Sequence, residues 1–157
     1  MAYEMDAIDR KILSKLTADA RVAVSQLAAE IGLSRGAVAE RIEKMERQGV
    51  IRGATVVVDP IAVGRAVTAF VSARGGPIAG KSTRIFRDLM RSDEILEVHT
   101  VAGDDCYLIK VRTDSIQSLN ALVSKLTAAP LSLTTRTTIV MESHCEKVGG
   151  IQIAGEH

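Results

Sequence analysis

Residues 75–82, Gly-Gly-Pro-Ile-Ala-Gly-Lys-Ser, match the pattern G-x-x-x-x-G-K-S/T of a phosphate-binding loop. In such a loop, backbone N–H groups hold the phosphates of a nucleotide and the lysine adds a positive charge. The loop follows a strand-like run, AVTAFVSA, and precedes a helix-like run, TRIFRDLMRS, as the motif requires. A nucleotide-hydrolysing enzyme is therefore one candidate for this chain.

Three features argue against this candidate. Pro77 removes one of the N–H groups that the loop would present. The strand-like run 95–101 continues into Ala-Gly before Asp104, so it does not end in an aspartate suited to magnesium. Phosphate loops also belong to parallel sheets, and this chain has too few β-α-β units to build one. We expect no enzyme, although Gly80, Lys81 and Ser82 at a helix start could hold a stray anion.

Metal and cofactor chemistry has equally little support. The three histidines, at positions 99, 144 and 157, show no metal-ligand spacing, and neither Cys106 nor Cys145 has a C-x-x-C partner. We therefore expect no metal, no cofactor and no disulfide. Cys106 could act as a redox switch, but an inert buried thiol is the simpler interpretation.

Composition limits the class of protein. The chain has 157 residues, of which 46% are hydrophobic and 25% charged, enough for one globular domain or two small ones. No apolar run approaches the roughly 20 residues of a membrane span, and the start, MAYEMDAIDRK, does not resemble a signal peptide. We expect a cytoplasmic protein with no membrane contact. Because the net charge is only +1, any affinity for nucleic acid must come from local placement of charge.

Residues 1–53 contain three short helical patterns. Asp6 and Ser34 are placed to cap the first and third helices, the second begins near Ser25, and Gly32 and Gly49 end the second and third. Two short helices joined by a tight turn predict a winged-helix-like helix-turn-helix domain. The apolar faces comprise Ile8, Ile12, Leu13 and Leu16 in the first helix, Leu27, Ala28 and Ile31 in the second, and Val38, Ile42 and Met45 in the third.

The outward face of the third helix could enter a major groove. Small residues, Gly36 and Ala37, would allow close approach to DNA near the start of this helix. Arg35 could bond two acceptors of a guanine, and Glu40 could accept from a cytosine amine. The cations at positions 44, 47 and 52 could meet phosphates. The alternative is a three-helix packing unit with a solvated charged face.

Residues 65–157 follow a different pattern, separated from the first by an expected linker strand over 54–64. The order β-α-β-β-α-β predicts a ferredoxin-like domain, so the chain as a whole is of the α+β class. Its two helices would cover one sheet face, and a partner subunit the other, which we expect to be broadly apolar with threonines. The expected strands are 66–73, 95–101, 107–112 and 131–141, and the expected helices are 83–91 and 115–127.

Several motifs together resemble the leucine-responsive regulator and AsnC family, the feast/famine transcription regulators. In the first region they are D-x-x-D-x-x-I-L-x-x-L from Asp6, L-A-x-x-I-G-L-S from Leu27, V-x-x-R-I from Val38 and E-x-x-G-V-I-x-G from Glu46. The second region contributes VAGDDCYLIKV and TRTTIVM. Ala54 departs from the family, which often has Tyr there.

The resemblance implies a regulator that binds double-stranded DNA, forms dimers through the sheet and assembles further, often to octamers. It also implies an effector, an amino acid or similar small molecule, at a G-x-x-D loop that maps to positions 103–106, with Cys106 in place of the usual aspartate. The predicted DNA contacts are Arg21, Ser25, Gln26, Ser34, Arg35, Gly36, Ala37, Glu40, Arg41, Lys44 and Arg52. The predicted effector contacts are Val101, Gly103, Asp104, Asp105, Cys106, Tyr107, Thr135, Thr137 and Thr138.

Two alternatives stay open at this point. The loop could be an ordinary hairpin turn, because Gly and Asp are the residues that turns need. The protein could then be an architectural DNA-binding protein with no effector, which would require the same fold.

Overall fold

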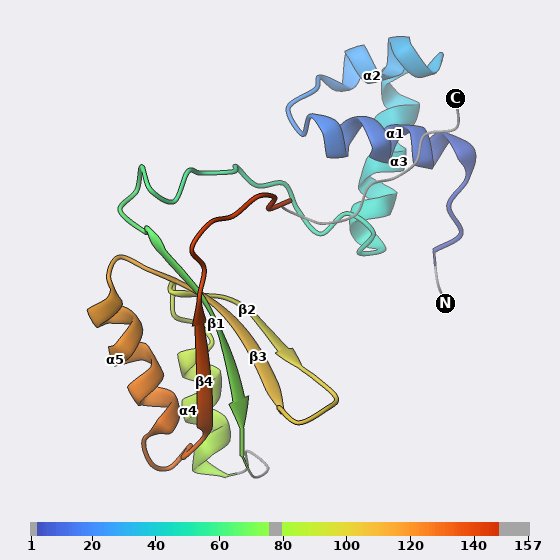
Figure 1. Ribbon diagram of the computed structural model, residues 1–157. Coiled ribbons are helices and arrows are strands. Elements are labelled where there is room, and N and C mark those ends of the chain that lie inside the picture. Colours follow the sequence, from blue (N-terminus) through green and yellow to red (C-terminus); the bar gives the residue numbers. More distant parts are fainter. Residues whose placement is uncertain (1–2, 76–79, 148–157) are drawn as a thin grey trace. The chain divides into compact units, whose positions relative to one another are not determined.

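The computed structural model describes residues 3–75 and 80–147, apart from the side chain of Lys81. The chain divides into two compact units (Figure 1). The first comprises the residues up to Val57 together with Lys147, and the second comprises Val58–Glu146. Each unit is described by itself. Within the described ranges, no helix is long and apolar enough to cross a bilayer.

The first unit consists of helices α1 (Ala7–Ala18), α2 (Val24–Ile31) and α3 (Arg35–Arg47). α1 begins at a capping box, in which the Asp6 carboxylate accepts from the Asp9 N–H and the Asp9 carboxylate accepts from the Asp6 N–H. α3 begins at Ser34, whose Oγ accepts from the Ala37 N–H at 3.2 Å. α2 ends at Gly32, which has a φ of 79°. The predicted helix-turn-helix is confirmed.

The core of the first unit is small and lies between all three helices. Ile12, Leu27, Val38 and Met45 are fully buried. Each such side chain contributes about 1.5–3 kcal/mol by burial. The apolar face of α3 thus packs in the core, and its opposite face is exposed to solvent.

The second unit is a four-stranded antiparallel sheet with two helices. Its strands follow the spatial order β2-β3-β1-β4, and each neighbouring pair is antiparallel. The ferredoxin-like arrangement is confirmed. In chain order the elements are β1 (Val67–Arg74), α4 (Lys81–Leu89), β2 (Ile95–Thr100), β3 (Tyr107–Thr113), α5 (Ile116–Thr127) and β4 (Thr134–Ile139).

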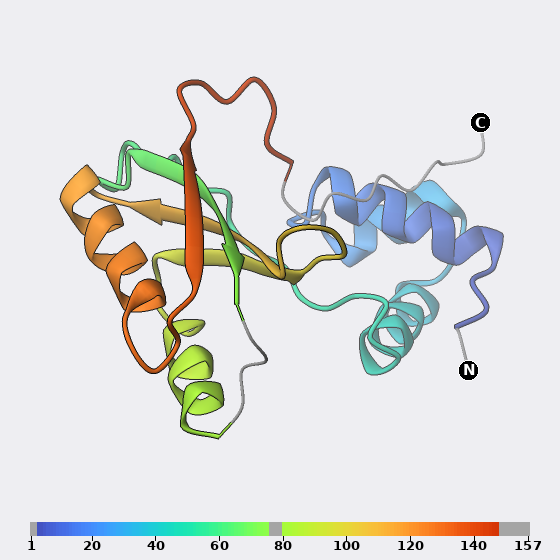
Figure 2. The same cartoon turned by 60° about the horizontal axis from the view of Figure 1, so that its bottom comes forward.

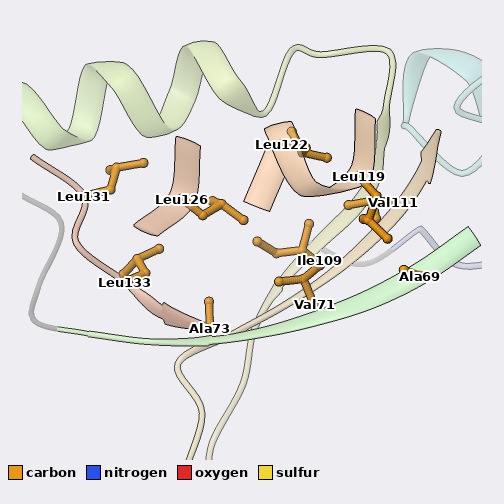
Figure 3. Close-up of a cluster of buried hydrophobic side chains, with 10 residues drawn as sticks. All are labelled: Ala69, Val71, Ala73, Ile109, Val111, Leu119, Leu122, Leu126, Leu131 and Leu133. Carbon is orange, nitrogen blue, oxygen red and sulfur yellow. The ribbon is translucent and has the colours of Figure 1, made fainter. Parts of the chain in front are cut away.

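α4 and α5 cover one face of the sheet (Figure 2). Val71 on β1 and Ile109 on β3 are register partners and point toward Leu122 and Leu126 of α5 (Figure 3). From α4, Phe86 packs against the Tyr107 ring with centroids 5.0 Å apart. The alternation of each strand therefore divides its residues between a buried face and a helix-free face.

The last strand is shorter than predicted. Leu131 and Leu133 are buried in the core below α5, and the Leu133 N–H donates to the Leu126 carbonyl. Ser132 between them has a φ of 48°. Because the chain folds back on α5 here, β4 begins only at Thr134.

The segment 54–64, where a linker strand was expected, contains no strand in this structure. Its apolar side chains are exposed, with Val57 77% and Ile61 72% accessible. A run of exposed β-branched residues has unpaired backbone edges that another chain could pair with.

The helix-free face of the sheet differs from the expectation of a broadly apolar surface. Phe70 is 38% exposed there, but Lys110 and Arg112 of β3 lie on the same face and both bind the carboxylate of Glu146. Glu97 on β2 accepts from Lys110 at 3.4 Å. The face is a mixture of apolar and charged groups because β3 places Leu108 on it together with two cations, Lys110 and Arg112.

Candidate DNA interface and effector loop

The outward face of α3 carries polar side chains that form no ion pair with any part of the chain that the structure describes. Arg35 and Glu40 are exposed, and neither forms an ion pair with any described residue. Gly36 has no need to be glycine on internal grounds, because a Cβ built there would meet nothing within 4 Å. This surface can therefore accept a close external partner such as the edge of a major groove.

Arg41, predicted as a DNA contact, is occupied within the unit. Its Nη1 donates to Asp6 Oδ2 at 2.6 Å and to Asp9 Oδ1 at 2.7 Å, and the Asp9 side chain is only 3% exposed. The hydrogen bond to Asp6, and then that to Asp9, raises the pKa of Arg41. The Asp9 N–H, followed by Arg41, lowers the pKa of Asp6. Arg41 thus ties α3 to the start of α1.

Lys44 extends the same network toward the surface. Its Nζ lies 5.4 Å from the centre of the Tyr3 ring, and the Tyr3 hydroxyl donates to Asp9 Oδ2 at 2.8 Å. The hydrogen bond to Asp9 raises the pKa of Tyr3. Lys44 stays exposed, so its ammonium group can still reach a phosphate.

Among the other predicted DNA residues, some form the start of α3 and the rest have exposed side chains. Ser34 caps α3, and Ala37, whose N–H it binds, is half-buried. Gln26 donates to Glu30 at 3.1 Å but remains exposed. Arg21, Ser25 and Arg52 are exposed as well.

The loop between β2 and β3 is tied to β1 by its backbone. The Val101 N–H donates to the Cys106 carbonyl at 3.0 Å, and the Cys106 N–H donates to the Ala73 carbonyl at 2.9 Å. Gly103 has a φ of 136°, a conformation that favours glycine. The loop is therefore a defined hairpin whose two aspartates follow the glycine.

Asp104 and Asp105 border a hollow of about 490 Å³. Asp105 pairs with Arg136 of β4 at 3.3 Å, and Arg74, at the end of β1, supplies a second cation. The hollow thus presents two carboxylates and two guanidinium groups, which suit a small zwitterion. Its lining residues are Arg74, Asp104, Asp105, Thr134, Thr135 and Arg136.

Both arginines were missed from the sequence. Arg74 pairs with Thr134, and Arg136 pairs with Ser72, so both lie on the helix-free side of neighbouring strands. Alternation with the buried Val71 and Ala73 could have placed Arg74 there, but β4 has no buried residue that would have placed Arg136. Their proximity to the loop could not be foreseen without the pairing of β1 with β4.

Not all of the predicted effector residues gather at this hollow. Tyr107 packs against Phe86 in the core, and Thr137 pairs with Val71 on the same, helix-covered face. Thr138 pairs with Phe70 on the opposite face. Only Asp104, Asp105 and Thr135 of the predicted set line the hollow; Val101, Gly103 and Cys106 belong to the hairpin backbone that holds it.

Cys106 stands where a carboxylate was expected. Its Sγ lies 3.6 Å from the Gly75 carbonyl, to which the thiol donates. The side chain is half-buried and joins the loop to the end of β1. A carboxylate could not donate in this way unless it were protonated.

The phosphate-loop pattern has no matching architecture. Residues 76–79 lie outside the described part of the chain, but β1 before them is antiparallel to both of its neighbours. α4 begins at Lys81, and the Ser82 hydroxyl donates to the Pro130 carbonyl at 3.0 Å. The described residues also contain no group of three or more His, Cys, Asp or Glu side chains that could hold a metal.

Comparison with known proteins matches both units. Residues 5–46 match the AsnC-type helix-turn-helix domain, and residues 68–149 match the Lrp/AsnC ligand binding domain. The HTH-type transcriptional regulator FL11 of Pyrococcus abyssi is 32% identical over 93% of this chain and 95% of its own length. The proline dehydrogenase transcriptional activator of Rhodobacter capsulatus is 35% identical over 91% and 94%.

Solved structures agree with these matches. The crystal structure of the Mycobacterium tuberculosis leucine response regulatory protein, LrpA, superposes with a TM-score of 0.80 at 31% identity, covering 91% of this chain and 97% of that one.

Proposed function

The chain belongs to the Lrp/AsnC family of transcription regulators, and from this premise we propose that it reads duplex DNA with α3 and senses an amino acid at the loop after β2. It is a DNA-binding regulator with a ligand-binding domain, and it is not an enzyme. The proposed DNA-reading role of α3 is supported by its exposed face, on which Arg35 and Glu40 have no ion-pair partner among the described residues.

The DNA-reading proposal can be tested with the full-length protein. Duplexes selected from a random pool should yield a pseudo-palindromic site, because a dimer presents two copies of α3 to one face of the duplex. Fluorescence anisotropy should then show that the selected site binds at least tenfold more tightly than a scrambled one. Failure to bind any duplex at low salt would contradict the proposal.

The effector proposal rests on the charges around the hollow. We propose that Asp104 and Asp105 hold the ammonium group of an amino acid, and that Arg74 and Arg136 hold its carboxylate. A ligand must then compete with the Asp105–Arg136 pair. That LrpA of M. tuberculosis is named for a response to leucine supports an amino acid as the class of effector.

A thermal-shift screen of the twenty amino acids would identify the effector, because a ligand of the folded state raises its melting temperature. For a hit, calorimetry should show at least a tenfold loss of affinity in Asp104→Asn and Arg136→Gln. The matched control is Asp93→Asn, since Asp93 is exposed and lies outside the hollow. Equal affinity in all variants would place the ligand elsewhere, and the absence of any hit would favour an architectural DNA-binding protein.

Self-association completes the proposal. We propose a dimer formed by the helix-free face of the sheet, and an octamer as the higher assembly. The exposed Phe70 and the exposed valines at 56–58 support an added chain on these surfaces. Light scattering tests this: a monomer at micromolar concentration would contradict it.

Two further assignments belong to the same proposal. We divide the chain into a DNA-binding domain at 1–53, a linker at 54–64 and a sensing and oligomerisation domain at 65–157. We assign its activity to the cytoplasm, where a regulator of this family would meet bacterial or archaeal DNA; fluorescence microscopy of a tagged copy tests that assignment.

A further inference from the structure

α4 carries a stripe of arginines on the side that faces away from the sheet. Arg84, Arg87 and Arg91 follow at spacings of three and four residues, which places them along one side of the helix. The side chains of Arg84 and Arg91 are 87% and 76% exposed. The opposite side of α4 is anchored by Phe86 and Leu89, which pack on the core.

The stripe has a surplus of positive charge. Its one acid, Asp88, lies 3.9 Å from both Arg84 and Arg91, at the limit of an ion pair. Exposed pairs of this kind contribute less than about 1 kcal/mol. Arg87 forms no ion pair with any described residue. Three arginines against one aspartate leave a net charge of +2 that the fold itself does not use.

The stripe borders a shallow hollow of about 450 Å³, which also touches Gly80 and Thr83. Along a helix, the rise from Arg84 to Arg91 is about 10 Å. Phosphates along one strand of duplex DNA follow at about 3.4 Å of helix axis, so this rise spans three steps. Guanidinium groups form paired hydrogen bonds with phosphate oxygens.

We propose that the arginine stripe of α4 is a second DNA-contact surface, which binds the phosphate backbone without reading sequence. The ligand-binding unit then contributes to affinity while α3 supplies specificity. The inference rests on the DNA-binding function of the chain, since only that function brings duplex DNA to the protein. It does not depend on the proposed effector site, whose arginines are Arg74 and Arg136.

The test uses the full-length protein and a random-sequence duplex, followed by fluorescence anisotropy between 50 and 200 mM salt. Arg84→Gln/Arg87→Gln/Arg91→Gln should weaken binding at low salt at least tenfold. The slope of log affinity against log salt should become shallower by about 2–3, because each lost phosphate contact removes about 0.9. Discrimination between the selected site and a random duplex should survive.

Single variants provide a matched control. Arg87→Gln should weaken binding measurably, whereas Lys125→Gln, which removes an exposed cation from α5, should not. Thermal melts of all variants should coincide with the wild type, since the stripe supports no core contact. An unchanged salt slope in the triple variant would overturn the proposal. It would also be overturned if the triple variant lost affinity for duplex RNA but kept its affinity for duplex DNA. Failure of the wild type to bind any duplex would instead contradict the DNA-binding function itself.

Discussion

The two units differ in which of their charged and apolar side chains find partners within the same unit. In the helical unit, Arg41, Asp6 and Asp9 tie α3 to α1, whereas Arg35 and Glu40 on the proposed reading face form no ion pair with a described residue. In the sheet unit, the polar groups near the loop already hold one another, as the Asp105–Arg136 pair shows. One sheet face and the segment after α3 still expose apolar side chains.

This difference teaches where regulation can act. The proposed reading helix, α3, is held to α1 by contacts within its own unit, so the proposal requires no rearrangement of it. The hollow that borders the Asp105–Arg136 pair and the uncovered face of the sheet are the surfaces to which we propose that a ligand and a partner copy bind. In the proposed function, ligand and partner copies bind the second unit, and the first unit binds DNA.

The largest expected effect separates the stabilities of the two units. Leu122→Ala removes a fully buried side chain from between α5 and the sheet. It should lower the free energy of unfolding of the sheet unit by about 2–5 kcal/mol. Calorimetry should show that transition shifted while the helical unit keeps its own. A single transition that moves as a whole would break the comparison.

A smaller effect on stability should distinguish Arg41 from Arg35, which lies on the same helix, α3. Arg41→Ala leaves Asp9 buried without its cation, and because Arg41 is itself partly exposed we expect a loss of about 2–3 kcal/mol in stability of the helical unit, somewhat below the cost of breaking a fully buried pair. Chemical denaturation measures this loss. Adding Asp9→Asn to Arg41→Ala should recover part of it, since the uncompensated charge is removed. A fully stable Arg41→Ala would show that the clamp is unnecessary.

In contrast to Arg41→Ala, Arg35→Ala should weaken DNA binding and leave stability unchanged. Arg35 forms no ion pair with any described residue, so the denaturation midpoint should stay unchanged. Binding to the preferred duplex should weaken by about 1–3 kcal/mol, with relaxed preference at one base position. Binding assays on single-base variants of the site measure this. A uniform loss on all sequences would show that Arg35 meets phosphate instead of a base.

The smallest effect concerns the charges on the helix-free face. Lys110, followed by Arg112, lowers the pKa of Glu146, and Glu146 raises the pKa of Lys110. The Glu146 contribution is therefore complete above about pH 4.3, the ordinary value for Glu, and is lost as the pH falls through the lower folded value. The Lys110 contribution is complete below about pH 10.4 and is lost as the pH rises through the higher folded value.

Because these groups are partly exposed, Glu146→Gln should cost less than about 1 kcal/mol at pH 7. It should also flatten the decline in stability of the sheet unit between pH 5 and 3. Thermal melts across this range measure the effect, with Asp93→Asn as control. A decline as steep as that of the wild type would show that Glu146 contributes nothing.

The sequence was sufficient to predict those features that depend only on residues within one or two helical turns along the chain. Asp6 and Ser34 cap their helices, and Gly32 ends α2 with a positive φ, as predicted. Alternation along the strands and the order of elements determined the ferredoxin-like fold. These features are local because a cap, a turn or an amphipathic face needs only residues close in sequence.

Only the tertiary structure decided which side chains meet across the fold. Arg41 looked like one more outward cation of α3 until its partners, more than 30 residues away, were seen at 2.6–2.7 Å. Arg74 and Arg136 reach the loop aspartates because β1 pairs with both β3 and β4. Ion pairs and strand registers join residues that are distant in sequence, and the pattern of any one segment does not specify its partner. The sequence by itself thus determined the helices, the order of the four sheet strands and the family, and the packing decided which charges pair within the fold and which stay exposed.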